Sequence, residues 1–490
     1  MKDGSVSEVT TTLPRPVLLI GNERRETGTA GAFEHVNPAT GRPQGTVPMA
    51  GAPDVDDAVA AAREAFPAWR DTPGPARREI LAALSRLIRD NAAELGRLAT
   101  LESGAPVAIS GRTVTGPAEW FSYYAGWADK LTGEVVPVVP GAFDYTRPEP
   151  YGVVGAIVPW NAPFLVGAMK LAPALAAGNC VVMKPPELAP WTCLRLAELA
   201  QEAGLPPGVL NVVPGGAEAG DALVRHAAVA KVSFTGGVDV GRIVARTAGE
   251  CLKPVVLELG GKSANIVFDD ADLDTAVPLT IGLLMSMAGQ GCALPTRLLV
   301  QSGIYDEVLD RARAITEGIP VGDPMDPATV MGPVISARHC DRILGLVAAT
   351  RASGAGRLLT GGKRLGGDLA DGFFVAPTLF ADVDPNSDLA QEEVFGPVLA
   401  VTRFDDEEEA VTLANDSRFG LAAYVQTRDL ARAHRVAAGL EAGFVSINTK
   451  PLVSPPTPFG GVKQSGFGRE GGAEGLREFL VTKNVCVGLG

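Results

Sequence analysis

The amino-acid sequence predicts an α/β fold with parallel sheets, and three features carry this prediction. From about residue 150 onward, short apolar runs alternate with segments of helical periodicity, which is the pattern of βαβ units. Most of the apolar runs end in a glycine or proline turn, as buried strands do. The chain has 490 residues, about two to three times the length of a usual single domain, so at least two lobes are expected.

The strands of the first lobe are expected before residue 260. The apolar runs there are "VVGAIVP" (153–159), "CVVMKPP" (180–186), "LNVVPGG" (210–216), "KVSFTGG" (231–237) and "VLELGG" (256–261). Helical segments lie before and between them. One begins with Asp54 as a candidate N-cap, and another follows "MKPPE" and stops at Gly204.

A second alternating region predicts the other lobe, from 261 to about 460. Its strand candidates are "SANIVF" (263–268), "RLLV" (297–300), "LAVTRF" (399–404), "AAYVQT" (422–427) and "GFVSIN" (443–448). We therefore place the boundary between the lobes near residue 260. Residues 1–14 are polar and without periodicity, which predicts a flexible tail.

Composition excludes several classes of protein. Apolar residues make up 46% of the chain and charged residues 20%, the balance of a folded globular protein. The formal charge of −13 disfavours nucleic-acid and anionic-membrane partners, which require clustered Lys and Arg. No apolar run is long enough for a signal peptide or a membrane span, so a cytoplasmic protein is expected. Six cysteines and four histidines show no paired or metal-ligand spacing, which predicts reduced thiols and no metal.

Three local signals could carry chemistry, and each has a simpler alternative. Cys292 in "AGQGCALP" is either a small buried residue or a nucleophile. Gly236 and Gly237 connect a strand to a helix, either as a plain turn or as a phosphate site at the helix N-terminus. Lys184 and Glu187 leave a strand end, where an open α/β sheet holds its ligand, although a solvated ion pair fits them as well.

Seven strings occurring in one order resolve these alternatives. They are "VPWNAP" (158–163), "NCVVMKPPE" (179–187), "FTGGVDVG" (234–241), "LELGGKSA" (257–264), "GQGC" (289–292), "EEVFGPV" (392–398) and "PFGGVKQSGFGRE" (458–470). Together they resemble the aldehyde dehydrogenase superfamily, and the resemblance extends from "VNPATGRP" (36–43) to "VTKNV" (481–485). It implies a Rossmann-type parallel-sheet cofactor domain, an α/β catalytic domain and a small β-arm for oligomerisation.

The resemblance assigns the catalytic groups. It makes Cys292 the nucleophile and Glu258 the general base, and it assigns the oxyanion to the amide of Asn161 and the backbone N–H of Cys292. Lys170 and Glu470 match a pair that either relays protons or forms a structural salt bridge. The implied reaction is NAD-dependent oxidation of an aldehyde to the acid, through a thiohemiacetal and a thioester on Cys292.

The resemblance also assigns the cofactor and substrate contacts. NAD is expected rather than NADP, because a carboxylate at Glu187 suits two ribose hydroxyls and repels a 2′-phosphate. The cofactor contacts carried over are Val158, Pro159, Trp160, Lys184, Pro186, Glu187, Gly220, Phe234, Thr235, Gly236, Gly237, Val240, Leu259, Gly260, Glu393 and Phe395. The substrate-pocket residues are Ala162, Met169, Met287, Gly291, Ala293, Val453 and Phe459. These are mostly apolar, which favours neutral aliphatic or aromatic aldehydes.

The domain boundaries follow from the same comparison. We assign 15–129 and 150–260 to the NAD-binding domain, 261–460 to the catalytic domain, and 130–149 with 476–490 to the oligomerisation segments of a homodimer or homotetramer. "EVVPVVP" in the first of these segments is compatible with an edge strand.

Two positions and one loop depart from the family pattern. Gly237 stands where the family usually has a serine, and Met287 stands where it usually has an asparagine. The phosphate loop that begins at "PGGAEAG" is one residue shorter than usual.

Two other functions stay open. A CoA-acylating dehydrogenase is one alternative, although Glu258 favours water as the acyl acceptor. A non-catalytic protein that retains the fold is the other.

Overall fold

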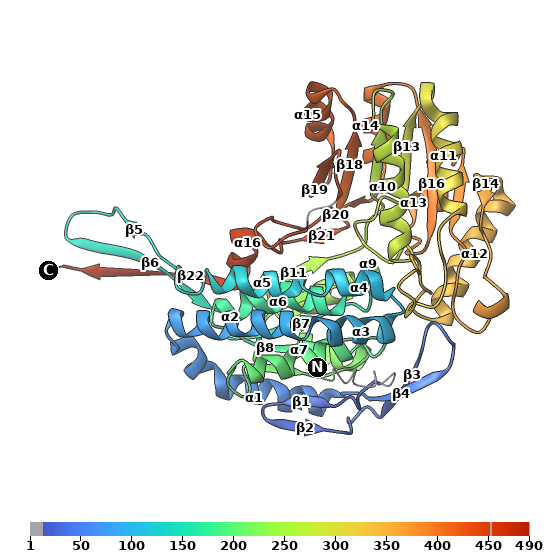
Figure 1. Ribbon diagram of the computed structural model, residues 1–490. Coiled ribbons are helices and arrows are strands. Elements are labelled where there is room, and N and C mark those ends of the chain that lie inside the picture. Colours follow the sequence, from blue (N-terminus) through green and yellow to red (C-terminus); the bar gives the residue numbers. More distant parts are fainter. Residues whose placement is uncertain (1–12, 451–452, 490) are drawn as a thin grey trace, which may run out of the picture.

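The computed structural model describes residues 13–450 and 453–489, which form two lobes and a projecting arm (Figure 1). The lower lobe in Figure 1 contains most of the first 260 residues, and the upper lobe contains the second sheet. The parallel-rich α/β architecture expected from the sequence is confirmed.

The first sheet has the strand order β2-β1-β9-β8-β7-β10-β11-β21. Neighbouring strands from β9 to β11 pair in parallel, whereas β1, β2 and β21 are antiparallel additions at the edges. The bounds are β1 Leu18–Ile20, β2 Glu23–Arg25, β7 Val153–Ile157, β8 Cys180–Lys184, β9 Leu210–Val212, β10 Val229–Thr235, β11 Val255–Glu258 and β21 Gly466–Phe467. The strand β21 comes from far downstream, and no pattern in the sequence predicts that this segment joins the first sheet.

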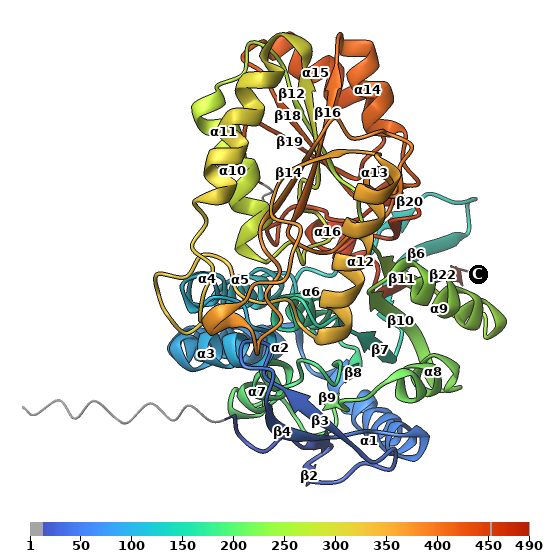
Figure 2. The ribbon, with the colours of Figure 1, turned by 90° about the vertical axis from the view of Figure 1, so that its right-hand side faces the viewer.

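Helices cover both faces of this sheet, with α1, α8 and α9 on one side and α2 to α7 on the other (Figure 2). Their bounds are α1 Ala52–Asp71, α2 Gly74–Asp90, α3 Ala92–Ser103, α4 Val107–Thr113, α5 Gly116–Ala125, α6 Pro163–Ala176, α7 Trp191–Glu202, α8 Ala217–Arg225 and α9 Val238–Glu250. The expectation that Asp54 is the N-cap of α1 is wrong. Gly51 is the N-cap, and Asp54 lies at the third helical position, where its carboxylate accepts the N–H of Gly51 (3.0 Å).

The second sheet has the strand order β14-β15-β16-β13-β12-β18-β19, and all pairs except β14 with β15 are parallel. Its strands are β12 Ala264–Val267, β13 Arg297–Gln301, β14 Arg357–Thr360, β15 Thr378–Ala381, β16 Val398–Phe404, β18 Ala422–Gln426 and β19 Phe444–Ile447. The helices are α10 Leu273–Ser286, α11 Tyr305–Glu317, α12 Ala337–Ser353, α13 Asp388–Gln391, α14 Glu407–Asn415 and α15 Leu430–Gly439. Consecutive strands β11 and β12 belong to different sheets, so the chain changes lobes near residue 260.

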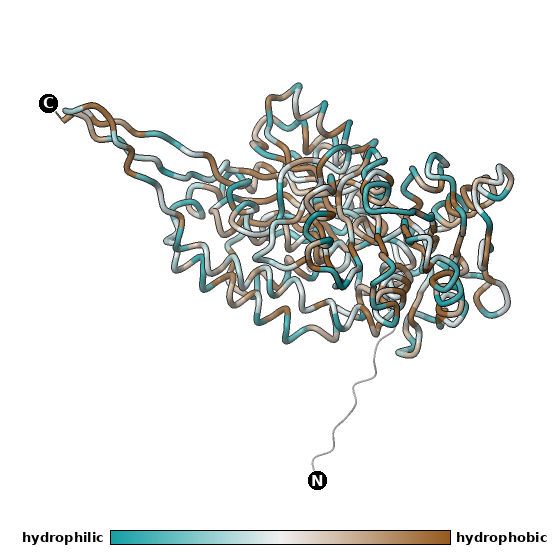
Figure 3. Tube along the Cα trace, turned by 90° about the horizontal axis from the view of Figure 1, so that it is seen from above, coloured by the Kyte–Doolittle hydropathy of each residue, from teal (hydrophilic) through white to brown (hydrophobic). Residues whose placement is uncertain are grey.

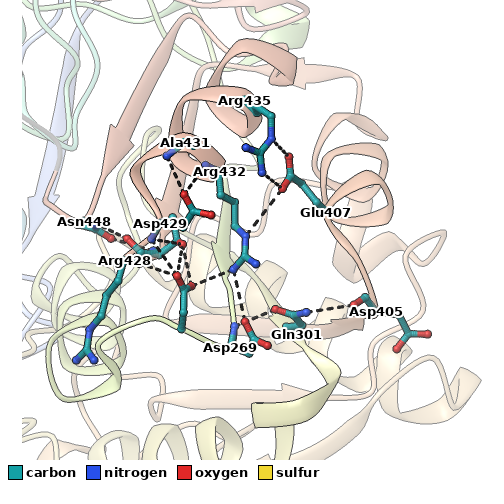
Figure 4. Close-up of polar contacts among 12 residues, drawn as sticks. Asp269, Gln301, Asp405, Glu407, Arg428, Asp429, Ala431, Arg432, Arg435 and Asn448 are labelled. Atoms are coloured by element: carbon teal, nitrogen blue, oxygen red, sulfur yellow. Dashed lines mark hydrogen bonds and ion pairs between the residues drawn. The ribbon is translucent and has the colours of Figure 1, made fainter.

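The polar side chains at the outer end of the second sheet form a dense network (Figure 4). Asp270, just beyond β12, accepts hydrogen bonds from the Thr427 hydroxyl (2.7 Å) and from the backbone N–H of Asp429 (2.9 Å), and it pairs with Arg432 (3.1 Å). Asp429 caps the N-terminus of α15 in turn. These contacts fix the loop that follows β18 to the loop that follows β12.

The arm is a three-stranded antiparallel sheet that extends away from both lobes (Figure 3). Its strands are β5 Val135–Val136, β6 Ala142–Pro150 and β22 Leu480–Gly488. The edge strand expected within "EVVPVVP" is only the two residues of β5. Side chains of Val135, Val139 and Leu489 on the arm are 69%, 72% and 64% exposed.

Small elements complete the described chain. They are β3 Ala32–Val36 with β4 Pro43–Pro48, β17 Phe419–Gly420 with β20 Val462–Lys463, α16 Gly472–Arg477, and two 3₁₀ turns, Ser302–Ile304 and Gly367–Leu369. Across 13–450 and 453–489, no helix combines the length and the apolar character that a membrane crossing requires.

Candidate active site

A cleft is lined by residues from both lobes. The first lobe contributes the β7–α6 loop, the β10–α9 turn and the end of β11, and the second lobe contributes the segment after α10 and the loop at Glu393. Four of the five expected catalytic residues line it: Cys292, Glu258, Asn161 and Glu470. All seven expected substrate-pocket residues line it as well: Ala162, Met169, Met287, Gly291, Ala293, Val453 and Phe459.

Cys292 lies in the turn between α10 and β13, half-buried in the cleft wall. Gly289 in this turn has a φ of +71° and packs directly against the backbone of Gly396, so a side chain there would be excluded. Burial raises the pKa of the Cys292 thiol to about 12, while the backbone N–H groups of Cys292 and Ala293 act in the opposite direction. The thiol of this state is therefore protonated near neutral pH, and its nucleophilicity increases with pH.

Asn161 reaches the cleft from the loop between β7 and α6. Its side-chain Nδ2 donates to the carbonyl oxygen of Gln290 (2.9 Å), two residues before Cys292. The amide carries a second N–H, and the residue lines the cleft. The bond to Gln290 thus fixes the amide beside the cysteine turn across the boundary between the lobes.

Glu258 is the last residue of β11, and its side chain is buried without a partner. The residue is 3% exposed, and neither carboxylate oxygen accepts a hydrogen bond within the described chain. Burial raises its pKa well above the usual range, and the nearby charge of Glu470 acts in the same direction. A buried carboxylate with a raised pKa binds a proton more tightly than an exposed one, which is the property of a general base.

Lys170 and Glu470 form a buried ion pair next to Glu258. The Lys170 Nζ lies 2.7 Å from a Glu470 oxygen and also donates to the Ser233 hydroxyl (2.9 Å). Lys170 does not line the cleft, whereas Glu470 does. The expected pair is therefore present, and Glu470 is its member next to the cleft.

The β10–α9 turn has the properties of an anion site. Gly237 is the N-cap of α9, and no side chain in 13–450 or 453–489 caps that helix, so its first N–H groups can donate to a ligand. A Cβ placed on Gly237 would meet no atom within 4 Å. The Thr235 hydroxyl is buried in the same turn and has no hydrogen-bond partner among the residues that the structure describes, and Thr235 lines the cleft. These residues fit a phosphate-bearing ligand.

The other expected cofactor residues divide into two groups. Those lining the cleft are Pro159, Trp160, Thr235, Gly236, Gly237, Leu259, Gly260, Glu393 and Phe395. Those lying beyond its boundary are Val158, Lys184, Pro186, Glu187, Gly220, Phe234 and Val240. Lys184 donates to the carbonyl of Gly215 (2.7 Å), and burial lowers its pKa to about 8.

Sequence reasoning missed His339 and Arg342, which line the cleft from α12. His339 Nε2 lies 2.6 Å from the carbonyl oxygen of Phe395, and Arg342 donates to the carbonyls of Glu393 and Val394. Phe395 has a φ of +53°, which is strained for a non-glycine residue, so these bonds hold a costly loop conformation. The three-residue spacing of His339 and Arg342 on one helix face was the available signal.

The aromatic rings around this loop are also in contact. Trp160 packs edge-on against Phe395 with ring centroids 5.3 Å apart, and against His339 at 5.4 Å. Burial lowers the pKa of His339 to about 4, so its ring is neutral. Glu393 accepts the N–H of Gly261 (3.0 Å), and burial raises the pKa of Glu393 to about 7.

The fold and the cleft define an α/β enzyme in which a thiol, an amide and a buried carboxylate meet between two lobes. Residues 25–485 match the family described as "Aldehyde dehydrogenase family". An aldehyde dehydrogenase of Enchytraeus buchholzi is 43% identical over 477 residues, 96% of this chain and 95% of that one. The chain therefore belongs to the aldehyde dehydrogenase family, and it is an oxidoreductase that acts on aldehyde groups.

Solved structures agree with this assignment. PnpE from Pseudomonas sp. WBC-3, solved in complex with nicotinamide adenine dinucleotide, is 42% identical with a TM-score of 0.95 and covers 97% of this chain and 98% of its own. A betaine aldehyde dehydrogenase from Staphylococcus aureus, in complex with NAD⁺, is 38% identical with a TM-score of 0.95, covering 97% and 95%.

Proposed function

We propose that this protein uses NAD to oxidise a neutral aldehyde to the carboxylic acid, through a thiohemiacetal and then a thioester on Cys292. One observation carries the proposal: Cys292, Asn161 and Glu258 line the same cleft. They supply the nucleophile, the oxyanion donor and the base of such a reaction.

The residues present fit NAD. The free N-terminus of α9 with the unpartnered Thr235 hydroxyl suits the pyrophosphate, and the carboxylates of Glu187 and Glu393 suit ribose hydroxyls. The two solved relatives bound to this dinucleotide support the same choice. When bound, NAD supplies the acceptor for the hydride that leaves the substrate carbon.

The side chains of this protein carry the other steps. The Cys292 thiol loses its proton to solvent as its sulfur bonds to the aldehyde carbon, and the Asn161 amide and the Cys292 N–H stabilise the oxyanion that forms. Glu258 later removes a proton from the water that hydrolyses the thioester. Because no hydrogen bond holds the Glu258 carboxylate, the side chain is free to reach that water. The Lys170–Glu470 ion pair either accepts the proton that Glu258 gains or compensates the resulting change in charge.

The cleft wall supports a neutral, apolar substrate. Its non-catalytic side is formed by Leu165, Val166, Met169, Val453 and Phe459. Arg342 is the one Lys or Arg among the lining residues, and its guanidinium is engaged by backbone carbonyls beside Glu393. No free cation of the lining is left to bind a substrate carboxylate.

The test is a panel of hexanal, benzaldehyde, betaine aldehyde and succinic semialdehyde with NAD and with NADP, followed at the absorbance of the reduced nicotinamide. We expect turnover of the neutral aldehydes with NAD, and loss of at least about a thousandfold in Cys292→Ala. Free acid formed without CoA separates this function from CoA-acylating chemistry. If the Cys292→Ala variant showed unchanged turnover, the measured rate would be a non-enzymatic background. The protein would then be a non-catalytic one that retains the fold.

We further propose a homodimer or homotetramer joined through the arm. Strands β6 and β22 pair along their whole length, and the arm extends away from the lobes with exposed apolar side chains at 135, 139 and 489 (Figure 3). Such a sheet edge is typical of a surface that pairs with another chain. Light scattering of the full chain and of a variant lacking 134–142 tests it. The cytoplasmic location stays a prediction from the sequence.

A further inference from the structure

The turn that carries Cys292 is held by side chains from three directions. Upstream of the cysteine, the Gln290 carbonyl accepts the Asn161 amide (2.9 Å), and the Gln290 side chain accepts the N–H of Ile335 (2.9 Å). Downstream, the hydroxyl of Tyr424 lies 2.5 Å from the carbonyl oxygen of Ala293. Within the described chain, this is the one side-chain hydrogen bond to the backbone of 291–294.

Tyr424 is rigidly placed. It lies in the middle of β18, which pairs in parallel with β12 on one side and β19 on the other. The residue is 2% exposed, and the bond to Ala293 is its single hydrogen bond from the side chain in the described structure. A buried tyrosine hydroxyl requires a partner, so the sheet and the cysteine turn are linked through this one oxygen.

The cysteine turn is also confined from the same side by Gly261. A Cβ at Gly261 would overlap the carbonyl oxygen of Cys292, and it would lie 3.2 Å from the Cβ of Leu421. Two consecutive carbonyls, those of Cys292 and Ala293, are thus fixed against the second lobe. The N–H groups of Cys292 and Ala293 lie beside the sulfur, where they favour the thiolate.

We propose that Tyr424 is a positioning residue for the nucleophile: its hydroxyl holds the Ala293 carbonyl and thereby keeps the Cys292 sulfur aimed into the cleft. Tyr424 does not line the cleft, so it acts through the turn and not on the substrate. The proposal rests on the proposed role of Cys292 as nucleophile. Burial raises the pKa of Tyr424 far above the working pH range, so the hydroxyl stays a neutral donor.

The experiment compares Tyr424→Phe with Tyr305→Phe. Tyr305 is an equally buried tyrosine of the same lobe, 1% exposed, whose hydroxyl bonds to Asp382 (3.1 Å) far from the cysteine turn. Four quantities are measured for each variant and for the wild type: the rate of Cys292 alkylation by iodoacetamide from pH 7 to 9.5, kcat, KM for NAD, and the melting temperature. Alkylation requires no aldehyde, so it tests the turn independently of the substrate.

We expect Tyr424→Phe to lower both the alkylation rate and kcat by about three- to tenfold, the loss of one hydrogen bond, with KM for NAD unchanged. Tyr305→Phe should leave both rates at the wild-type value. Wild-type rates in Tyr424→Phe overturn the proposal, and so does a parallel decrease in both variants that follows their melting temperatures. If the wild type is alkylated at Cys292 but oxidises no aldehyde, the proposed function fails while the effect of Tyr424 on alkylation still decides this inference.

Discussion

Two carboxylates in different parts of the molecule differ in how their charge is compensated. Asp270, in the outer network of the second lobe, accepts bonds from Thr427 and from the backbone of 428 and 429, and it pairs with Arg432. Glu258, at the centre of the cleft, is 3% exposed and accepts no bond within the described chain. Asp270 therefore links two loops, whereas Glu258 is a buried carboxylate whose charge is not compensated by a hydrogen bond in the described chain.

The difference separates a structural carboxylate from a reactive one. An unpaired buried carboxylate destabilises the fold, and such groups concentrate at sites where a proton must be moved. Replacing each carboxylate by its amide isostere should therefore have opposite effects on activity and stability.

The largest effect is expected for Glu258→Gln. Without the base, kcat should fall by about 10²- to 10⁴-fold, while a pre-steady-state burst of reduced nicotinamide persists because acylation of Cys292 is retained. Rapid mixing with hexanal and NAD measures both. Glu102→Gln is the matched control, since Glu102 is fully buried but accepts the N–H groups of Trp191 (2.7 Å) and Thr192 (3.2 Å). It should lower stability and leave kcat near the wild-type value; equal losses of kcat would contradict the comparison.

Stability of the same variant should depend on pH. The pKa of Glu258 is raised in the folded state, so its contribution to stability is fully present below the unfolded pKa of about 4.5 and is lost as pH rises through the folded pKa. Glu258→Gln is neutral throughout, so its melting temperature should exceed that of the wild type at pH 8 and converge with it towards pH 5. Scanning calorimetry across this range measures the gap, and a constant gap would show that Glu258 is not a titrating buried group.

The next effect concerns the charge beside Glu258. Lys170→Met leaves Glu470 as a buried carboxylate without its 2.7 Å partner, which should raise the pKa of Glu258 further. The acid limb of the kcat profile should move about one pH unit to the alkaline side, with roughly a tenfold loss at pH 7. The double variant Lys170→Met/Glu470→Gln removes both charges and should restore most of the profile. A profile unchanged in the single variant would limit the pair to a structural role.

Removing the charge of the paired carboxylate, Asp270, should lower the stability of the fold and leave kcat unchanged. Asp270→Asn loses charge-assisted bonds to Thr427 and Arg432, so the melting temperature should fall by ~2 to 5 °C with kcat unchanged. Asp274→Asn in the same lobe is the control, because its side chain is 86% exposed in its pair with Arg311 and should shift neither quantity. A lower kcat in Asp270→Asn at full folding would connect the outer network to the cleft.

The smallest effect is expected for substitution of Gly237, a residue that has no side chain. Gly237→Ser would add a hydroxyl at the N-cap of α9, where a Cβ meets no neighbour within 4 Å. We expect the Kd for NAD to fall by about two- to fivefold, measured by quenching of tryptophan fluorescence. Gly237→Ala controls for the added Cβ and should leave Kd unchanged. A weaker complex in both variants would show that the ligand approaches the backbone of the turn directly.

The sequence predicted the parts of this molecule that depend on local pattern. Every apolar run named as a strand lies on a strand, because burial on both faces of a parallel sheet imposes continuous apolar residues. The residues expected to be catalytic were found by their motifs, and four of them meet in the cleft. Their roles stay predictions until the variants are measured.

What the sequence did not reveal depends on contacts between distant segments. The two-residue strand β21 is too short to show a periodicity. In the sequence, Tyr424 is only one residue of an apolar strand, and its contact with the cysteine turn is known only from the position of β18 in the fold. His339 was one of four isolated histidines, and its contact with Phe395 exists only because α12 packs beside that loop. The Asp54 cap was misplaced because aspartate suits both the N-cap and the third position of a helix.

The pairing of β21 with β11 has a consequence for how the protein is made. Glu258 lies opposite Gly466 in that pairing, so the strand that ends in the expected base gains its outer neighbour only after residues 466 and 467 have left the ribosome. A nascent chain stalled before residue 460 would expose an unfinished sheet edge, open to chaperones and to aggregation. Loss of the segment 461–489 should consequently harm this protein by leaving the strand that carries Glu258 at an open sheet edge.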